Sequence, residues 1–95
     1  MTDQHRSTAT LGTSKASRYL QTMCKHFSHK VKTEFTLDRG QIEFPFGNCE
    51  LTATGSALDL EVSATTVADL KKLQNVVGSH LERFAFREKL IVTWK

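Results

Sequence analysis

Residues 31–62, VKTEFTLDRGQIEFPFGNCELTATGSALDLEV, decide the fold. Apolar and polar side chains alternate here with a period of two, as in strands that bury one face. Turn sequences interrupt the alternation at Asp38-Arg39-Gly40, Gly47-Asn48 and Gly55-Ser56, and the last of these fits a two-residue type II′ turn. Strands joined by turns this short pair with their neighbours in sequence. The sequence therefore predicts four consecutive antiparallel strands.

Two segments with helical periodicity flank these strands. Between residues 14 and 30, apolar residues recur at i, i+4, i+7 and i+11, which predicts a first helix capped by Thr13 or Ser14. Thr66 and Asp69 have the spacing of a capping box, a hydroxyl followed three residues later by an acid. A periodic apolar run follows them and predicts a second helix.

The two ends of the chain complete the predicted order. Residues 90–94 are rich in β-forming residues and predict a fifth strand. Residues 1–13 are rich in Thr and Ser with one Leu, which predicts a flexible tail before a single domain of residues 14–95. We thus expect an α+β fold with the order α-β-β-β-β-α-β, in which both helices pack on one face of an antiparallel sheet. The expected core is Leu20, Met23, Phe27, Phe35, Phe44, Leu60, Leu73, Val77, Leu81 and Phe84.

Composition narrows the class of protein. With 95 residues, 39% hydrophobic and 24% charged, the chain resembles one globular domain. It has no apolar run of the roughly 20 residues that span a bilayer, and its polar start lacks the apolar region of a secretory signal. We therefore expect a cytoplasmic protein that does not enter a membrane. In that compartment Cys24 and Cys49 are expected to be free thiols.

The net charge of +3 is unevenly distributed. Residues 4–33 contain six basic and no acidic residues, whereas residues 34–95 contain nine acidic and seven basic residues. On the first helix, Arg18, Lys25 and His29 fall opposite the apolar stripe and form a candidate surface for an anion or a partner. A solvated helix face explains the same pattern. The acidic residues expected on the outer side of the sheet are Glu34, Asp38, Glu43, Glu50, Asp59 and Glu61.

A second candidate site uses residues near the end of the second helix. His26, His80, Arg83 and Arg87 could line an anion pocket beside the first helix, since an arginine can clamp a carboxylate with two hydrogen bonds. A structural ion pair of these arginines with Glu50 or Glu82 is the alternative, and a histidine satisfied by a backbone group is the alternative for His80.

The cysteines and histidines are the residues that could bind a metal or provide a thiol nucleophile. Cys24 and His26 point about 160° apart on a helix and cannot share a metal. His26 and His29 lie about 60° apart and could share one. The chain has no CxxC or HxxxH pair, nucleophile elbow, P-loop or dinucleotide fingerprint. We therefore predict no metal, no cofactor and no catalytic residue, and keep a metal-binding protein or enzyme using Cys24, His26 or His80 as the alternative.

Three stretches together carry a resemblance to a known family. They are SRYLQTMCKHFSHK at 17–30, EFPFGNCEL at 43–51 and LQNVVGSHLERFAFRE at 73–88. The chain after residue 13 resembles a bacterial family known as domain of unknown function 2218. The resemblance implies a stand-alone bacterial domain, and similar domains occur joined to siderophore-interacting, flavin-dependent ferric reductases. It implies no catalytic residues.

These observations favour a small non-catalytic binding or accessory domain, with a link to iron and siderophore metabolism implied by the resemblance. The expected partner is a small anionic ligand or a protein. A self-associating module, with oppositely charged faces, is a further alternative, so we expect a monomer or a weak homodimer. Nucleic acid is disfavoured, because the aromatic residues nearly all fall on buried phases rather than outside as stacking platforms.

Overall fold

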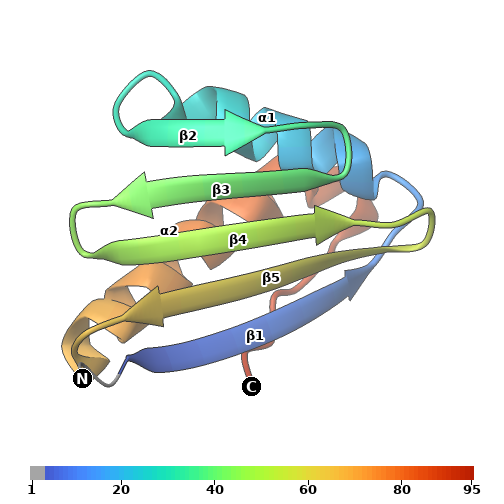
Figure 1. The fold of residues 1–95 in the computed structure, drawn as a ribbon. Helices are drawn as coiled ribbons and strands as arrows, with labels where there is room; N and C mark the ends of the chain where they lie inside the picture. The colour runs from blue at the N-terminus through green and yellow to red at the C-terminus, as the bar shows by residue number, and fades with distance from the viewer. Residues whose placement is uncertain (1–3) are drawn as a thin grey trace.

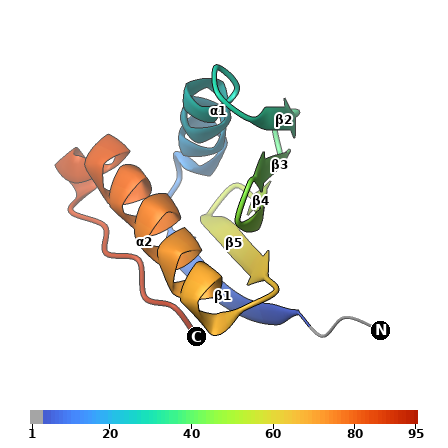
Figure 2. The ribbon, with the colours of Figure 1, turned by 90° about the vertical axis from the view of Figure 1, so that its left-hand side faces the viewer.

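The computed structural model describes residues 4–95 and contains one sheet and two α-helices (Figure 1). The elements are β1 (His5–Gly12), α1 (Ala16–Phe27), β2 (Lys32–Phe35), β3 (Arg39–Phe44), β4 (Gly47–Ala53), β5 (Ala57–Ala64), α2 (Val67–Phe84) and the 3-10 turn η1 (Phe86–Glu88). The strands are antiparallel in the order β1-β5-β4-β3-β2. Both helices cover one face of the sheet and leave the other open (Figure 2). The predicted α+β class and layer arrangement are confirmed.

The length and hydropathy of α1 and α2 bear on whether either helix could cross a membrane. Between residues 4 and 95, neither helix combines the length and the apolar character needed to cross a membrane.

The N-terminal prediction was wrong, because residues 5–12 form the edge strand β1. This strand pairs with β5 along its whole length. Ser7, Ala9 and Leu11 are buried beneath the helices, while Thr8 and Thr10 alternate with them toward solvent. The backbone hydrogen bonds to β5 stabilise this polar stretch as a strand. The composition of residues 5–12 does not reveal that such a partner strand exists. The remainder of the predicted tail, residues 1–3, lies outside the described residues.

The C-terminal prediction was also wrong, since residues 90–94 form no strand. They run along α2 on the side away from the sheet (Figure 2). The backbone N–H of Val92 donates to the Glu82 carboxylate over 2.9 Å, and the segment reaches the sheet only where Lys95 and Thr8 exchange backbone hydrogen bonds. The outer edge of β5 pairs with β1 and therefore offers no place to residues 90–94. The observed order of elements is β-α-β-β-β-β-α.

The predicted meander is confirmed, but two of its turns lie elsewhere. Arg39 and Gly40 belong to β3, and the hairpin closes through Thr36 N–H donating to the Arg39 carbonyl over 2.7 Å. Pro45-Phe46 forms the next turn, which places Pro45 outside the ladder where its missing N–H costs nothing. Gly55-Ser56 is a turn as predicted. It is not type II′, because the only glycine of residues 4–95 with a positive φ is Gly47.

The helix N-termini differ from each other in their caps. The Thr66 hydroxyl accepts a hydrogen bond from Asp69 N–H over 3.1 Å, which confirms the predicted cap of α2. The first helix begins after Lys15 with no side-chain cap. Instead the Thr13 hydroxyl accepts from the Lys15 N–H over 3.0 Å, which shapes the turn that leads into the helix.

Most of the predicted core is confirmed, with three exceptions among the phenylalanines. Phe35 is 36% exposed because β2 is a short edge strand, and Phe44 and Phe84 are only half-buried. Gly40 lies at the contact between β3 and α1, where a Cβ would stand 2.7 Å from Cys24 Sγ. The absence of a side chain there lets the helix approach the sheet closely. The largest fully buried side chains are Leu20, Met23, Ile42, Leu51, Leu58, Leu60, Leu73 and Leu81.

Candidate functional site

The structure brings together Arg18 and Arg87, which were predicted to belong to two different candidate sites. They line a cavity of about 180 Å³ between α1 and η1. We call this cavity the cation pocket. Its lining residues are Lys15, Arg18, Tyr19, Thr22, Phe84, Phe86 and Arg87.

Helix geometry places one wall of the cation pocket. Arg18 and Thr22 are one turn apart on α1, and Lys15 comes just before its first turn, so all three lie along one side. The Thr22 hydroxyl donates to the Arg18 carbonyl over 2.9 Å, which orients its side chain along the helix.

A hydrogen-bonded carboxylate places the opposite wall. Glu88 in η1 accepts from the Tyr19 hydroxyl of α1 and, over 3.0 Å, from the Thr13 hydroxyl. Burial raises the pKa of Tyr19, and its hydrogen bond to Glu88 raises it further. The same hydrogen bond holds the pKa of Glu88 below its ordinary value. Tyr19 therefore stays a donor, and the contact holds η1, including Arg87, against α1.

The cations of this pocket form no ion pair with any residue from 4 to 95. In the described part of the chain, the ion pairs are Arg6 with Glu61 at 3.9 Å and Lys32 with Glu43 at 3.8 Å, both on the sheet. Among residues 4–95, Lys15, Arg18 and Arg87 thus have no carboxylate within 4.0 Å, although Lys15 is near enough to Glu88 for its charge to help lower the pKa of that carboxyl. The predicted ion pairs of Arg83 or Arg87 with Glu50 or Glu82 do not form.

The second group is a histidine cluster of His26, His80, Phe27 and Phe84. The ring centroids of His26 and His80 are 5.1 Å apart, and those of Phe27 and His80 are 5.0 Å apart. His80 Nδ1 lies 2.7 Å from the Val76 carbonyl oxygen. Since a carbonyl only accepts, Nδ1 carries the proton and Nε2 is left as an acceptor. The interpretation of His80 as satisfied by a backbone group is confirmed.

The histidine cluster is electropositive, which changes the titration of His26. His26 remains exposed, and its partial loss of solvent contact is the largest cause that lowers its pKa below the ordinary 6.5. The groups whose positive charge lowers it further are His80, Lys30, His29 and Arg83. His26 therefore favours its neutral form in the folded protein.

This lowered pKa predicts a stability change in mild acid. The unfolded chain protonates His26 near pH 6.5, whereas the folded protein resists protonation. We expect the free energy of unfolding to fall as the pH decreases below about 6.5, until the lowered pKa of folded His26 is reached. Above that window His26 is neutral in both states and contributes no pH dependence.

Urea unfolding at a series of pH values measures this effect. His26→Gln should flatten the profile below about pH 6.5. The matched control is His5→Gln, since His5 is an exposed histidine on β1 and lies outside the cluster. A profile that keeps its slope in His26→Gln would contradict the assignment.

The cysteines lie in the core, apart from the histidine cluster. Both are buried free thiols, as predicted. Burial raises the pKa of Cys24 to about 11, and burial raises the pKa of Cys49 even more. Cys24 lies against Gly40 of β3, so it does not join His26 and His80. Over residues 4–95, no group of three or more His, Cys, Asp or Glu side chains is placed to hold a metal ion.

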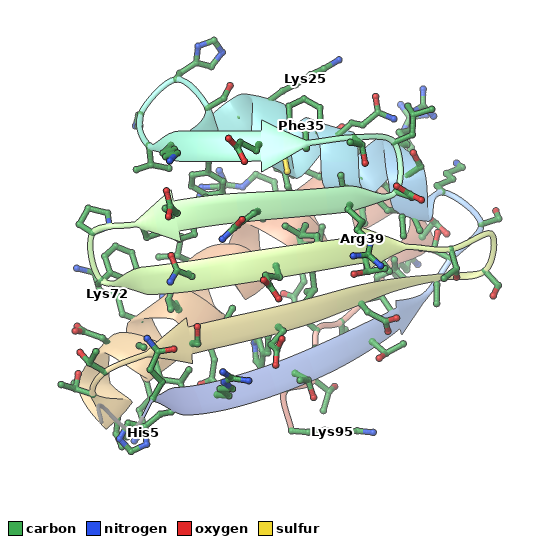
Figure 3. The ribbon with its side chains drawn as sticks, viewed as in Figure 1. His5, Lys25, Phe35, Arg39, Lys72 and Lys95 are labelled. Carbon is green, nitrogen blue, oxygen red and sulfur yellow. The ribbon has the colours of Figure 1, made fainter. Side chains whose placement is uncertain are left out.

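The remaining predicted site residues lie outside the cation pocket. Arg83 is exposed near the histidine cluster, where its charge acts on His26. Lys25 and His29 are exposed on and just after α1, and Figure 3 shows Lys25 pointing away from the helix. The predicted sites thus divide into a pair of arginines and a pair of histidines, with Lys25 and His29 in neither.

Lys15, Tyr19 and Glu88 are not among the residues predicted for a site from the sequence. Lys15 could have been found, because it lies three residues before Arg18 in the acid-free segment. Tyr19 and Glu88 are separated by 69 positions in the chain, and no local pattern indicates that they meet.

A larger cavity of about 390 Å³ lies on the sheet between β2, β3 and β4. Arg39 (Figure 3) shares it with the carboxylates of Glu34 and Glu50. Its mixed charges do not select an anion, whereas the cation pocket is lined by three cations and no carboxylate.

A five-stranded antiparallel sheet with two helices on one face and a cation-lined pocket at the helix ends defines the class as a small α+β domain. Residues 8–95 match the family described as "Uncharacterized protein conserved in bacteria (DUF2218)", and the chain belongs to this family. The NMR structure of PA4090 from Pseudomonas aeruginosa is 39% identical, with a TM-score of 0.80, over 95% of this chain and 94% of that chain. No curated protein matches the chain.

Proposed function

We propose that the protein is a small non-catalytic binding domain that receives a compact anion, such as a phosphate or carboxylate group, in the cation pocket. The observation that carries this proposal is the convergence of Lys15, Arg18 and Arg87 with no carboxylate of residues 4–95 within 4.0 Å of any of them. Cations of this kind form short, charge-assisted hydrogen bonds with oxyanions. The volume of about 180 Å³ is below that of pockets for drug-sized ligands, which favours a single anionic group.

The chemistry of the lining supports binding rather than catalysis. Tyr19 is held as a donor to Glu88, and the raised pKa of Tyr19 opposes its use as a base. The Cys24 thiol is buried, and its pKa of about 11 keeps it protonated near neutral pH. The side chains around the pocket thus orient and neutralise a ligand and supply no activated nucleophile.

The biological setting is proposed from the family resemblance. The resemblance implies that similar domains are sometimes joined to siderophore-interacting ferric reductases, and carboxylate-rich siderophores present the anionic groups that this pocket would take. We therefore place the protein in the cytoplasm, with iron or siderophore metabolism as its setting. Citrate-type carboxylates and inorganic phosphate are the first ligands to test.

Removing one pocket arginine should weaken anion binding strongly. Charge-assisted hydrogen bonds contribute roughly 1.5 to 3 kcal/mol each, so Arg18→Ala or Arg87→Ala should reduce affinity about 10- to 100-fold. Titration with phosphate and with citrate, followed by amide NMR shifts of residues 15–22 and 86–88, measures this. Affinity should also fall as salt is raised, because the pocket is open to solvent.

The control for this titration is Lys25→Ala. Lys25 lies on the same helix, is exposed and lies outside the pocket. Its loss should change the affinity little, which separates a pocket from general attraction to a basic helix. Equal losses in Lys25→Ala and Arg18→Ala would contradict the proposal, as would the absence of any shift in residues 15–22.

A second candidate function is metal binding by His26 and His80, favoured by their ring separation of 5.1 Å and by the free Nε2 of His80. Arg83 and Lys30 nearby oppose a cation, which makes this the weaker candidate. Elemental analysis of protein purified without a histidine tag discriminates between the two. A stoichiometric metal would favour the histidine cluster.

A further inference from the structure

We propose that two copies of this chain associate through β2, pairing antiparallel so that one sheet continues into the other. This inference does not depend on the cation pocket, which lies on the helical side of the molecule. It is carried by the hydrogen-bonding phase of β2, by the charges along it and by the difference between the two edges of the sheet.

The sheet protects one of its edges and leaves the other open. At β1, Lys95 N–H donates to the Thr8 carbonyl over 2.8 Å, and the Lys95 carbonyl accepts from Thr8 N–H over 3.4 Å. Lys95 therefore occupies the middle of this edge, and Figure 3 shows Lys95 beside β1. No described segment lies along the outer edge of β2 (Figures 1 and 2). An open edge strand is a template for another strand.

The phase of the β2–β3 ladder shows which backbone groups face outward. Thr36 N–H donates to the Arg39 carbonyl and closes the hairpin. In an antiparallel pair, hydrogen bonds to one neighbour come from alternate residues. Glu34 and Lys32 therefore bond to β3, while Thr33 and Phe35 direct their N–H and C=O groups away from it. These are the groups that a second copy would meet.

Charge selects one register for the second copy. With Thr33 opposite Thr33 of the second copy, the two residues exchange their backbone hydrogen bonds, and Lys32 lies opposite Glu34. Both side chains lie on the outer face of the sheet, where they line one small hollow with Gln41 and Glu43. Registers centred one residue away would set Glu34 against Glu34 or Lys32 against Lys32, and like charges directly opposite are destabilising.

Apolar contacts on the helical side favour the same register. Phe35 is 36% exposed, and its partner within the sheet is Gly40, which has no side chain to cover it. The register centred on Thr33 places Phe35 opposite Val31 of the second copy, and Val31 is itself only partly buried. Leu37, 71% exposed in the adjoining turn, extends the apolar strip. A second copy would therefore cover side chains that the monomer leaves in water.

The first test removes the central donor. Thr33→Pro deletes an N–H that the β2–β3 ladder does not use, and an edge strand tolerates proline at such a position. Sedimentation equilibrium up to roughly millimolar protein should show a dimer in the native chain and a monomer in Thr33→Pro. Amide NMR of the variant checks that the domain is folded. A native chain that stays monomeric at that concentration would overturn the proposal, as would a dimer that Thr33→Pro leaves unchanged.

The second test reverses charges in two complementary variants. Glu34→Lys sets Lys32 against a lysine, and Lys32→Glu sets Glu34 against a glutamate, so each variant alone should dimerise roughly three- to tenfold more weakly. An equal mixture of the two places opposite charges at both positions and should recover association between unlike chains. Failure of the mixture to associate better than either variant alone would overturn the register.

Intermolecular NOEs would observe the register of the β2–β2 pairing directly. In a sample mixed from isotope-labelled and unlabelled chains, an intermolecular NOE should join Lys32 Hα and Glu34 Hα, which lie opposite each other as a non-hydrogen-bonded pair. Within one chain these protons are two residues apart on an extended strand and too far apart for this NOE. An intermolecular contact between the acidic sheet face and α1 instead would assign the dimer to the charged faces and overturn the pairing of β2.

Discussion

Replacing Gly47 with alanine is expected to destabilise the protein by about 3 kcal/mol or more, the largest effect of a single methyl group that we predict for this fold. A Cβ at this position would stand 2.4 Å from both the Ser63 carbonyl oxygen and Leu73 Cδ1. The carbonyl belongs to the backbone of β5 and cannot move without disturbing the sheet. Gly47 also has φ +153°, which a residue with a side chain rarely adopts. Urea unfolding measures the loss.

Gly55→Ala is the matched control for this substitution. Gly55 also lies in a hairpin of the same sheet, but a Cβ there meets nothing within 4 Å, and its φ is not positive. We expect a change within about 0.5 kcal/mol. Equal losses in the two variants would show that glycine flexibility, rather than contact with β5 and α2, decides the effect.

Leu81→Ala is expected to cost about 3 kcal/mol, whereas Phe84→Ala should cost only about 1 to 2 kcal/mol. Leu81 is 0% exposed in the core beneath α2, so its truncation leaves a cavity among packed side chains. Phe84 is the larger residue, but it is half-buried at the end of α2 in the histidine cluster, where water reaches the vacated space. The order of the two losses therefore reverses the order of side-chain size.

Thermal or urea unfolding of both variants, with Lys25→Ala as an exposed helical control, tests this order. Helix periodicity alone places Leu81 and Phe84 on the same apolar stripe. Side-chain size would then predict the larger loss for the phenylalanine. A loss in Phe84→Ala of 3 kcal/mol or more, in the range of a fully buried ring, would contradict the half-buried position of Phe84 at the end of α2.

Local patterns predicted the elements whose signals are contained within a few residues. The alternation from Val31 to Val62 predicted the meander, and the Thr66 to Asp69 spacing predicted the cap that starts α2. Apart from two misplaced turns, one turn type and the cap of α1, the errors lie at the two ends of the chain. Residues 90–94 have the stronger β-forming composition, yet residues 5–12 form the strand beside β5.

The candidate site divides in the same way. The exposure of Arg18, Lys25 and His29 followed from helix periodicity. Which of them share a pocket did not, because the hydrogen bond between Tyr19 and Glu88 brings η1 against α1 and selects Arg18 and Arg87. His26 and His80 are likewise neighbours only because α1 and α2 pack side by side.

The sequence by itself determined the α+β class, the antiparallel meander, the start of α2 and the basic face of α1, because each depends on the period or spacing of nearby residues. Only the tertiary structure decided that β1 rather than the C-terminal segment borders β5, that the cations converge at η1, and that β2 remains an open edge. These features depend on hydrogen bonds and packing between segments far apart in the chain, as in the pairing of Thr8 with Lys95 and of Tyr19 with Glu88.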